Sequence, residues 1–384
     1  MRDFEVMTVE NFKSNVGVRP PLRIALISPP LNASGGIGRL MSYVLAYLDS
    51  QQVAVRHIDS RGRSSRPILS FFPMLRASLT LIALKATHRV DIVHINIAHR
   101  GSTVRKGAIA WLCYLMRIPT VLHLHSFEYE DFVRNLPPLF QRVIRKMFQR
   151  ADHIIVLGRI WENFLNEELG VSKRKVSILY NAAPGPPELV SRHSGLNEEN
   201  VRLLFVGQLG VRKGVPELLQ ALSRIPRLPF AWSITMAGDG DIGGARQSAL
   251  ELGILDRVTF TGWLDSAQIR GLLESSDVLI LPSHAEGFPM AIVEAFAYGV
   301  AVISSPVGAI AEIVLNNENG LLVSVGDVDG LEQAIKALCL DGPFRERLGL
   351  AGRRAWESHL NIANYANRLV KIWIDVAGQE RASS

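Results

Sequence analysis

Residues 278–298 carry the sequence VLILPSHAEGFPMAIVEAFAY, which indicates how this chain folds. The four apolar residues Val278–Leu281 predict a buried strand, and after a short loop a helix is expected at Met290–Tyr298. Pro289 is suited to the first turn of that helix, where its missing amide hydrogen costs no hydrogen bond. A short, fully apolar strand followed by a helix is typical of a parallel sheet that is covered on both faces.

The same alternation runs along most of the chain. In the first half, strands are expected at Leu22–Ser28, Val53–Ile58, Ile92–Asn96, Thr120–His125, His153–Leu157 and Val176–Tyr180, and helices at Gly38–Leu48, Phe72–Thr87, Arg105–Met116, Pro138–Arg150 and Ile160–Leu169. In the second half, strands are expected at Arg202–Val206, Trp232–Ala237, Val258–Thr261, Val278–Leu281, Ala301–Ser304 and Gly320–Val323, and helices at Val215–Ser223, Ala245–Leu252, Ser266–Glu274, Met290–Tyr298, Ala309–Leu315 and Asp329–Leu340. We therefore predict an α/β protein with two Rossmann-like, doubly wound domains and a cleft between them.

The boundary between the two domains is predicted at residues 181–200, where a proline- and glycine-containing stretch is followed by polar residues without periodicity. We expect a first domain at residues 1–190, a second at 191–365, and a C-terminal helix at 366–384 that packs back on the first domain. In paired α/β domains, ligands bind at the carboxyl ends of the strands, in the cleft between domains.

Charge is distributed unevenly along the sequence. Residues 1–190 hold 25 Lys and Arg against 14 Asp and Glu, whereas residues 191–384 hold 17 against 22. A basic first half favours contact with something anionic, such as a membrane surface, and no zinc spacing or aromatic–basic interleaving supports nucleic acid. The N-terminus lacks the apolar segment of a signal peptide, and no apolar run is long enough for a membrane span, so we expect a cytoplasmic protein.

Two candidate binding features in the first half lie at the ends of predicted strands, a glycine-containing loop and a pair of histidines. Residues 34–38, SGGIG, follow the first strand, and glycines there let amides approach a phosphate, although a tight turn is an equal alternative. No acidic residue closes the next strand as in nicotinamide or flavin enzymes. His123 and His125 point to one face of their strand, and His125, at its exit, could hydrogen-bond a sugar hydroxyl or shuttle a proton. A third ligand for zinc is not spaced nearby.

The second half contains two stretches that point to a diphosphate and a sugar. In residues 207–214, GQLGVRKG, the adjacent cations Arg212 and Lys213 precede a helix and suit a diphosphate, with a solvated pair as the alternative. In the quoted stretch, Glu286 lies where a sugar could dock. Glu294 lies on an apolar helix face, where a buried carboxylate needs either ligand hydroxyls, such as those of ribose, or a buried basic partner.

Two further glycine-containing loops are interpreted as turns. Asp239-Gly240-Asp241 resembles a metal-binding Asp-x-Asp, but it follows a strand in a glycine-rich loop, so turn chemistry is expected and no metal site. Residues 305–323 are interpreted as another strand-to-helix turn followed by a hairpin-like return.

Taken together, these segments resemble retaining glycosyltransferase family 4, which has the GT-B fold. The resemblance extends from Leu22 to about Ile374. Its most specific part is EGFPMAIVEAFAYG, with two glutamates separated by seven residues, followed by GVAVISSPVGAIAEIV and NGLLV. Residues 94–106, HINIAHRGSTVRK, resemble bacterial members that build exopolysaccharide or lipopolysaccharide.

The resemblance implies that the first domain binds the acceptor and the second binds a nucleotide-sugar. Glu294 would hold the ribose, Glu286 would contact the donor sugar, and Lys213 would bind the diphosphate. The residues expected to bind the donor are Gly36, Gly207, Arg212, Lys213, Glu286, Gly287, Phe288, Pro289 and Glu294, and those expected to be catalytic are His125, Lys213 and Glu286. The family often has arginine where this chain has Gln208, so Arg212 is a candidate substitute.

The expected reaction is transfer of a sugar from a UDP- or GDP-sugar, without a metal or other cofactor, to a glycan or lipid-linked glycan. Retention through a front-side route, as the resemblance implies, is the hypothesis, and no carboxylate nucleophile is evident on the opposite face of the sugar. Two alternatives stay open at this point, a nucleotide-sugar epimerase of the same fold and a catalytically silent partner subunit.

Peripheral contact with the inner face of the cell membrane is a further possibility. The helix Pro138–Arg150 carries Arg142, Arg145, Lys146 and Arg150, with Leu139, Phe140, Val143 and Met147 opposite them. Such a helix can rest on an anionic membrane, and a solvated basic face is the equal alternative.

Overall fold

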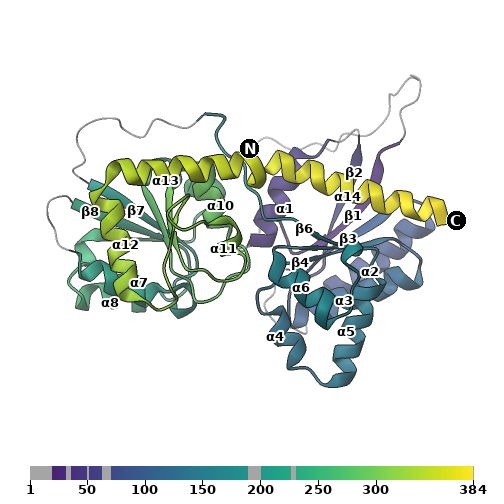
Figure 1. Ribbon diagram of the computed structural model, residues 1–384. Coiled ribbons are helices and arrows are strands. Elements are labelled where there is room, and N and C mark those ends of the chain that lie inside the picture. Colours follow the sequence, from purple (N-terminus) through teal and green to yellow (C-terminus); the bar gives the residue numbers. More distant parts are fainter. Residues whose placement is uncertain are drawn as a thin grey trace.

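The computed structural model describes residues 20–31, 36–49, 52–62, 71–188, 200–225 and 231–383, with side chains described to residue 378. Figure 1 shows two α/β domains side by side, each with a central sheet. The predicted fold class is confirmed, because both sheets have six strands and the neighbouring strands in each sheet pair in parallel. Ser34 and Gly35 of the predicted glycine turn lie outside the described residues.

The first sheet has the strand order β2-β1-β3-β4-β5-β6. Its strands are β1 (Leu22–Ser28), β2 (Val53–Asp59), β3 (Ile92–Ile97), β4 (Thr120–Leu124), β5 (His153–Val156) and β6 (Val176–Ile178). Its helices are α1 (Gly36–Tyr47), α2 (Phe71–Ala86), α3 (Gly101–Leu115), α4 (Tyr129–Arg134), α5 (Pro138–Arg150) and α6 (Arg159–Asn163), which continues as a π-helical turn at Phe164–Glu168. All residues of β3 and β4 are buried, as expected for strands with helices on both faces.

The second sheet has the strand order β12-β11-β10-β7-β8-β9, the Rossmann order. Its strands are β7 (Asn200–Val206), β8 (Ala231–Ala237), β9 (Val258–Gly262), β10 (Val278–Leu281), β11 (Ala301–Ser304) and β12 (Leu321–Leu322). Its helices are α7 (Val215–Ser223), α8 (Ile242–Glu251), α9 (Ser266–Ser275), α10 (Met290–Ala297), α11 (Ile310–Ile313), α12 (Val328–Leu340) and α13 (Gly342–Ala355). The expected hairpin-like return is wrong, since β12 pairs with β11 in parallel after the intervening α11.

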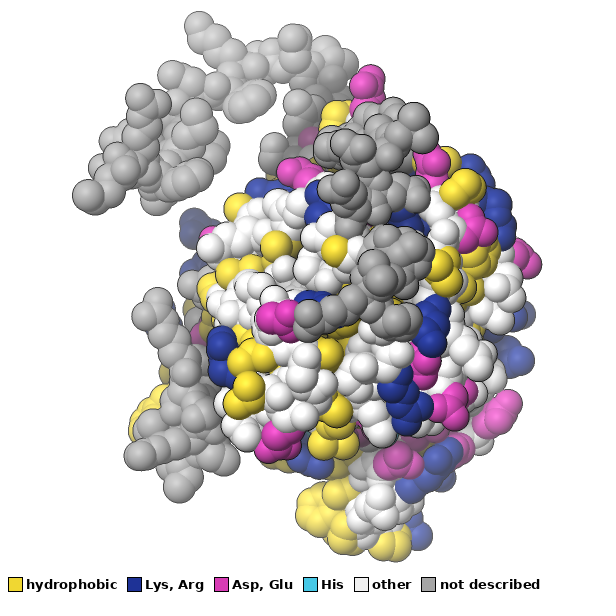
Figure 2. Space-filling view, turned by 90° about the vertical axis from the view of Figure 1, so that its left-hand side faces the viewer, with side chains coloured by type: hydrophobic (Ala, Val, Ile, Leu, Met, Phe, Trp, Pro, Cys, Tyr) yellow, Lys and Arg dark blue, Asp and Glu magenta, His cyan; other side chains and the backbone are white. Residues whose placement is uncertain are grey.

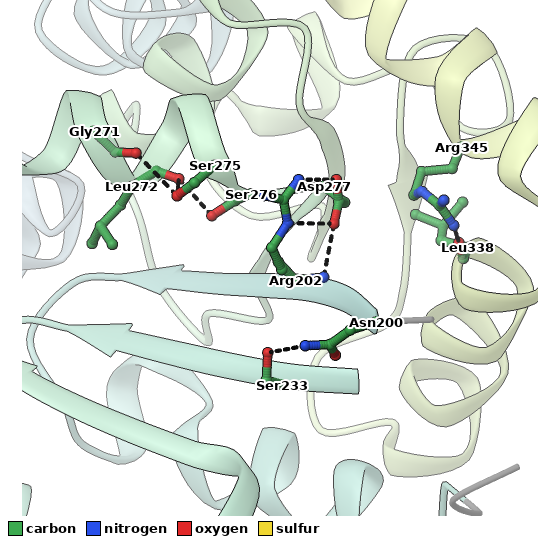
Figure 3. A network of polar contacts seen from close by, with 10 residues as sticks. All are labelled: Asn200, Arg202, Ser233, Gly271, Leu272, Ser275, Ser276, Asp277, Leu338 and Arg345. Carbon is green, nitrogen blue, oxygen red and sulfur yellow. Dashed lines mark hydrogen bonds and ion pairs between the residues drawn. The ribbon is translucent and has the colours of Figure 1, made fainter. Parts of the chain in front are cut away.

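An arginine–aspartate clamp joins the central strands in each domain. In β7, Arg202 donates from Nε and Nη2 to the two carboxylate oxygens of Asp277, at 3.2 and 3.1 Å, and from its backbone amide at 2.8 Å (Figure 3). In β1, Arg23 makes the same three contacts with Asp91, at 2.9, 2.6 and 2.8 Å. Asp91 and Asp277 directly precede β3 and β10, so each clamp fixes the register of the two strands between which the sheet order reverses.

The C-terminal helix α14 (Ile362–Ser383) returns to the first domain. Figure 1 shows it, in yellow, crossing above β1 and β3. Trp373 is 1% exposed, and its Nε1 donates to His94 Nδ1 of β3 at 3.1 Å. At the start of this return, Trp356 Nε1 donates to the carbonyl of Ala183 at 2.9 Å, which ties the C-terminal segment to the connection between the domains.

Candidate functional site

A cleft of about 510 Å³ lies between the two domains. The first domain contributes Gly36, Arg39, His125, Phe127 and Asn181, and the second contributes Gly207, Gln208, Arg212, Lys213, Asp239, Trp263 and Glu286–Ala291, among other residues. The loops after β7 and β10 both enter this cleft, and these two neighbouring strands are the point where the order of the second sheet reverses. That position is where ligands bind in open α/β sheets.

Lys213 and Glu286 form an ion pair inside the cleft. Lys213 Nζ contacts Glu286 Oε1, which also accepts a 2.9 Å hydrogen bond from the hydroxyl of Ser283. The two charged side chains are only 12% and 9% exposed. The structure therefore brings together the cation expected to bind a diphosphate and the carboxylate expected to contact a sugar.

Close backbone packing holds Lys213 at this position. Gly214, which follows it, has φ of 69°, and a Cβ there would lie 2.0 Å from the carbonyl oxygen of Pro282. Only glycine fits such a left-handed contact without displacing the backbone. The loop after β7 is therefore pressed against the end of β10, which explains why Lys213 reaches Glu286.

Arg212 is exposed and points toward the first domain. Its Nη1 donates to the carbonyl of Ala285 at 3.1 Å, and its guanidinium lies 5.6 Å from the ring centroid of Phe127. Gln208 also lines the cleft. Arg212 therefore contacts the protein itself through its guanidinium. That it takes the role of the family's arginine, where this chain has Gln208, stays a prediction.

Glu294 is the predicted donor residue that lies behind the cleft wall. It is 4% exposed, in the buried helix α10. Arg39 Nη1 donates to its Oε2 at 3.1 Å, and the hydroxyl of Tyr43 donates to its Oε1 at 3.0 Å. Burial raises the pKa of Glu294, while the charge of Arg39 acts in the opposite direction. Burial, followed by the charge of Glu294, raises the pKa of Tyr43 to about 12.

His125 follows β4 directly and lines the cleft. Asn96 of β3 donates from Nδ2 to the carbonyl of Ile27 at 3.5 Å, so its Oδ1 accepts from His125 Nε2 at 2.7 Å. The other ring nitrogen of a neutral His125 is then a hydrogen-bond acceptor. Burial, followed by the charges of neighbouring groups, holds the pKa of His125 well below its usual value. The ring centroid of His123 lies 3.8 Å from that of His125, with the two rings tilted by 37°, which confirms that they share a face of the strand.

The loop between Glu286 and α10 is held by residues of the first domain. Asn181 Nδ2 donates to the carbonyl of Phe288 at 2.7 Å, and Tyr180 stacks on the Phe288 ring at 5.3 Å. Within the described parts of the chain, the amides of Gly287 and Phe288 donate no hydrogen bond. These two amides can therefore donate hydrogen bonds to an anion bound at the start of α10.

Sequence reasoning did not single out Arg39, Tyr43, Asn96, Asn181 or Ser283. Their roles come from contacts with residues far away in sequence, and Arg39 is separated from Glu294 by 255 positions. The carboxylate on the apolar face of α10 indicated either ligand hydroxyls or a buried basic partner, but it did not indicate which residue that partner would be.

Asp239 and Asp241 behave as turn residues. Asp241 precedes α8 and accepts from the amide of Gly244 at 2.9 Å, and the carbonyl of Asp239 accepts from the amide of Leu209 at 2.6 Å. Over the residues that the structure describes, no group of three or more His, Cys, Asp or Glu side chains could hold a metal ion. The same residues include no helix with the length and apolar character needed to cross a bilayer.

Two known families match consecutive parts of the chain. The family described as Glycosyltransferase Family 4 matches residues 35–184, and that described as Glycosyl transferases group 1 matches residues 186–355. Together they span both domains and the cleft. The chain therefore belongs to the GT-B glycosyltransferases of the family 4 type.

Individual relatives agree with this assignment. The chain is 28% identical over 322 residues to a glycogen synthase of Mycobacterium tuberculosis, covering 80% of this chain and 75% of that protein. It is 32% identical over 151 residues to the lipopolysaccharide core biosynthesis glycosyltransferase LpsE of Rhizobium meliloti, covering 39% and 43% of the two chains. The structure of Anabaena Alr3699/HepE in complex with UDP superposes with a TM-score of 0.71 at 18% identity, covering 92% of this chain and all of that chain. The last similarity establishes the fold alone.

Proposed function

We propose that this glycosyltransferase transfers a sugar from a nucleoside diphosphate sugar, with retention and without a metal ion, to a glycan or lipid-linked glycan. The observation that carries the proposal is the Lys213–Glu286 pair at the switch point of the second sheet. A cation beside a carboxylate in a narrow cleft suits a donor that joins an anionic diphosphate to a neutral sugar. UDP and GDP are the nucleotides proposed, and the HepE structure named for its UDP complex supports the former.

The proposed chemistry stabilises the departing diphosphate. Negative charge develops on its oxygen as the glycosidic bond breaks, and Lys213 and the amides at the start of α10 can compensate it. Glu286 would then exchange its contact with Lys213 for a hydroxyl of the donor sugar. Arg212 could join the diphosphate if its guanidinium left the carbonyl of Ala285.

The proposed ribose site requires a rearrangement at Glu294. Both carboxylate oxygens already accept hydrogen bonds from α1 of the first domain. Ribose hydroxyls would replace the Tyr43 contact or share the carboxylate with Arg39. Donor binding is thereby linked to the relative position of the two domains.

Retention through a front-side route is proposed because of the groups near the transferred sugar. His125 is the side chain from the first domain expected beside that sugar, and its low pKa keeps it neutral. A neutral imidazole can accept a hydrogen bond from a sugar hydroxyl. The first domain would present the acceptor hydroxyl on the same side of the sugar as the leaving diphosphate.

We also propose that the first domain binds an anionic membrane surface and takes up the acceptor there. On α5, Leu139 and Phe140 are 66% and 56% exposed, beside the exposed Arg142 and Arg145. Met147 was expected on the same apolar face, but it is 5% exposed and packs in the core. Hydrophobic side chains project at the lower end of Figure 2, the height at which α4 and α5 lie in Figure 1.

Helix α2 adds a second exposed apolar stripe to the first domain. Phe72, Leu75, Leu79 and Ile82 are between 43% and 65% exposed and recur at helical spacing. Apolar side chains next to basic ones favour binding at an anionic bilayer surface. Charge reversal at Arg142 and Arg145 should release the protein from anionic vesicles, and failure of the wild type to bind such vesicles would refute the membrane contact.

The first experiment is thermal-shift binding of UDP, GDP, ADP and CMP. Wild type, Lys213→Ala and Glu294→Ala are compared, with the exposed Lys371→Ala as the matched control. We expect one diphosphate to stabilise wild type and the control and to lose its effect in the other two variants. If no nucleotide raises the melting temperature of the folded protein, the proposed donor site is refuted. The hypothesis of a catalytically silent partner subunit is then favoured.

Retention of the anomeric configuration is tested on the sugar that the enzyme first releases from the donor. NMR of the sugar released by slow hydrolysis of the donor should show the anomer of the donor before mutarotation sets in. Appearance of the opposite anomer would exclude the front-side route. Conversion of the donor into an epimeric nucleotide-sugar, with no free sugar or transfer product, would favour the epimerase.

A further inference from the structure

Glu312 of the second domain accepts two hydrogen bonds from the first domain. It lies in α11, on the side of the second domain that faces the first (Figure 1). Its Oε1 accepts from the backbone amide of Arg159 at 2.8 Å, and its Oε2 accepts from the hydroxyl of Tyr180 at 2.8 Å. Arg159 begins α6, and Tyr180 follows β6. Both carboxylate oxygens of Glu312 are therefore engaged by the first domain.

A glycine allows the two domains to approach closely at this contact. Gly158 directly precedes Arg159 and is buried. A Cβ on Gly158 would lie 2.5 Å from the Cβ of Ala309 and 2.7 Å from Oε1 of Glu312. Its φ of 175° is extended, so the lack of space, and not the backbone conformation, requires glycine. Any larger residue would push α11 away from the first domain.

The segment that leads into α11 also holds the loop that carries Glu286. The amide of Ala309 donates to the carbonyl of Gly287 at 3.1 Å. Gly308 has φ of 58°, and a Cβ there would lie 2.1 Å from the carbonyl oxygen of Glu286. Residues 308–309 are thus pressed against the backbone of Glu286 and Gly287, which both line the cleft. A shift of α11 would therefore move this part of the cleft wall.

Tyr180 supports the same loop directly. Its ring stacks on that of Phe288, with 5.3 Å between the ring centroids, and Phe288 lines the cleft. Burial, followed by the hydrogen bond to Glu312, raises the pKa of Tyr180 to about 12, so its hydroxyl keeps its proton at neutral pH. One tyrosine of the first domain therefore contacts the loop at Phe288 and, through Glu312, acts on the backbone at Gly287.

These contacts depend on the position of the two domains relative to each other. Relative motion is the default expectation for two domains of one chain. If the domains separate, Glu312 loses both hydrogen-bond donors and Phe288 loses its stacking partner. Glu286 stays in the second domain, but the loop that places it then lacks the support of the first domain.

We infer that Glu312 and Tyr180 are positioning residues, which set the loop of residues 286–288 for the reaction when the first domain docks against it. They act through the backbone of Gly287 and the ring of Phe288. A carboxylate suits this role because its two oxygens accept from two separate elements, and charge-assisted hydrogen bonds are stronger than neutral ones. The inference rests on the proposed function, since it takes this loop to contact the donor sugar.

The test is amide hydrogen exchange of the protein without ligand, followed by mass spectrometry of overlapping peptides. Wild type is compared with Glu312→Ala and Tyr180→Phe, of which the second keeps the aromatic ring on Phe288. The matched controls are Glu318→Ala and Tyr114→Phe, which alter exposed side chains. Both controls should exchange as wild type does.

The amides of Arg159 and Ala309 report on the two sides of the contact. In Glu312→Ala, we expect both amides to exchange about tenfold faster, the effect of losing a charge-assisted hydrogen bond. In Tyr180→Phe, the amide of Ala309 should exchange faster by a smaller factor, because Glu312 keeps the bond from Arg159.

Two results would overturn the inference. Faster exchange at Arg159 without any change at Ala309 would show that Glu312 only fastens the start of α6. Unchanged exchange at both amides would show that the contact holds nothing in place. Tyr180→Phe removes a single oxygen atom, so the test survives if Glu312→Ala does not fold. Because this experiment uses no nucleotide, a failure of the proposed donor site leaves its outcome intact.

Kinetics separate positioning of the loop from binding of the nucleotide. Hydrolysis is measured with UDP-glucose and GDP-glucose, and if wild type hydrolyses neither, the exchange experiment decides alone. We expect kcat to fall about tenfold in Glu312→Ala, with the Kd of the nucleoside diphosphate within about twofold of wild type. Glu312→Gln should recover part of the rate, since its amide oxygen still accepts from Arg159. A wild-type kcat in Glu312→Ala, or a loss confined to nucleotide affinity, would overturn the positioning role.

Discussion

Arg39 of α1 and Glu294 of α10 form an ion pair across the interface of the two domains, with 3.1 Å between Nη1 and Oε2. Their side chains are 22% and 6% exposed. The carboxylate expected to hold the ribose of the donor is therefore also a contact that keeps the domains together. Binding of a nucleotide and closure of the domains use the same side chain.

Removal of Arg39 should destabilise the protein more than neutralisation of Glu294. Arg39→Met leaves a buried carboxylate that keeps the hydrogen bond from Tyr43 but loses its ion pair, whereas Glu294→Gln leaves an arginine that can reach water. We expect a loss of about 2 kcal/mol in the free energy of unfolding for Arg39→Met, and clearly less for Glu294→Gln. Chemical denaturation measures both, and the double variant should recover part of the loss. Equal losses for the single variants would contradict this account.

The ionisation of Glu294 should appear in the pH dependence of stability. Its pKa is raised in the folded protein, so the folded state binds this proton more tightly than the unfolded state. The free energy of unfolding should therefore fall as the pH rises from the ordinary glutamate pKa through the raised value. Denaturation of wild type and Glu294→Gln between pH 4 and 7, as a rough window for glutamate, should show this component in the wild type alone.

Lys213→Ala should abolish most of the transfer activity without unfolding the protein. Lys213 is expected to compensate charge on the leaving diphosphate, and loss of one such group costs about 100- to 1000-fold in kcat. Steady-state kinetics should show this loss, with a much smaller effect for Arg212→Ala, whose guanidinium contacts Ala285. A Lys213→Ala enzyme with wild-type kcat would remove Lys213 from the proposed mechanism.

Asn96→Ala should impair catalysis through His125. The amide oxygen of Asn96 fixes the ring by accepting from Nε2 at 2.7 Å, so its removal frees the imidazole to rotate. We expect a lower kcat with little change in the KM for the donor, and Asn96→Asp should restore part of the rate. Because the pKa of His125 is well below its usual value, its ionisation should leave the rate unchanged between about pH 6 and 8. A KM effect alone would argue against this positioning role.

Lys106 should make the protein more stable as the pH rises above neutrality. Its pKa is about 7 in the folded state and 10.5 in a model lysine, so the unfolded state binds more protons between these values. The free energy of unfolding should then increase from pH 7 toward 10.5. The Lys106→Met variant should lack this component and exceed the wild type by a few kcal/mol near pH 7. A less stable Lys106→Met variant would show that the ammonium has a partner.

The regular elements were predictable because their signals are local. The strands Leu22–Ser28, Val278–Leu281 and Ala301–Ser304 and the helices Pro138–Arg150 and Val215–Ser223 have the predicted bounds. Helix α13 was missed because its glycines weaken the helical signal. Gly349 is required by packing, since a Cβ there would lie 2.2 Å from the carbonyl oxygen of Gly299. Tertiary contact therefore selected a residue that local propensity disfavours.

The sequence by itself determined the alternation of strands and helices, the parallel sheets and the residues at the strand ends, since these follow from periodicity and local chemistry. Only the tertiary structure decided which side chains meet. It paired Glu294 with Arg39, joined His125 to Asn96 by a hydrogen bond, and buried Lys106 in the first domain. These contacts join residues far apart along the chain, and their energies depend on burial and distance, which no local pattern of residues encodes.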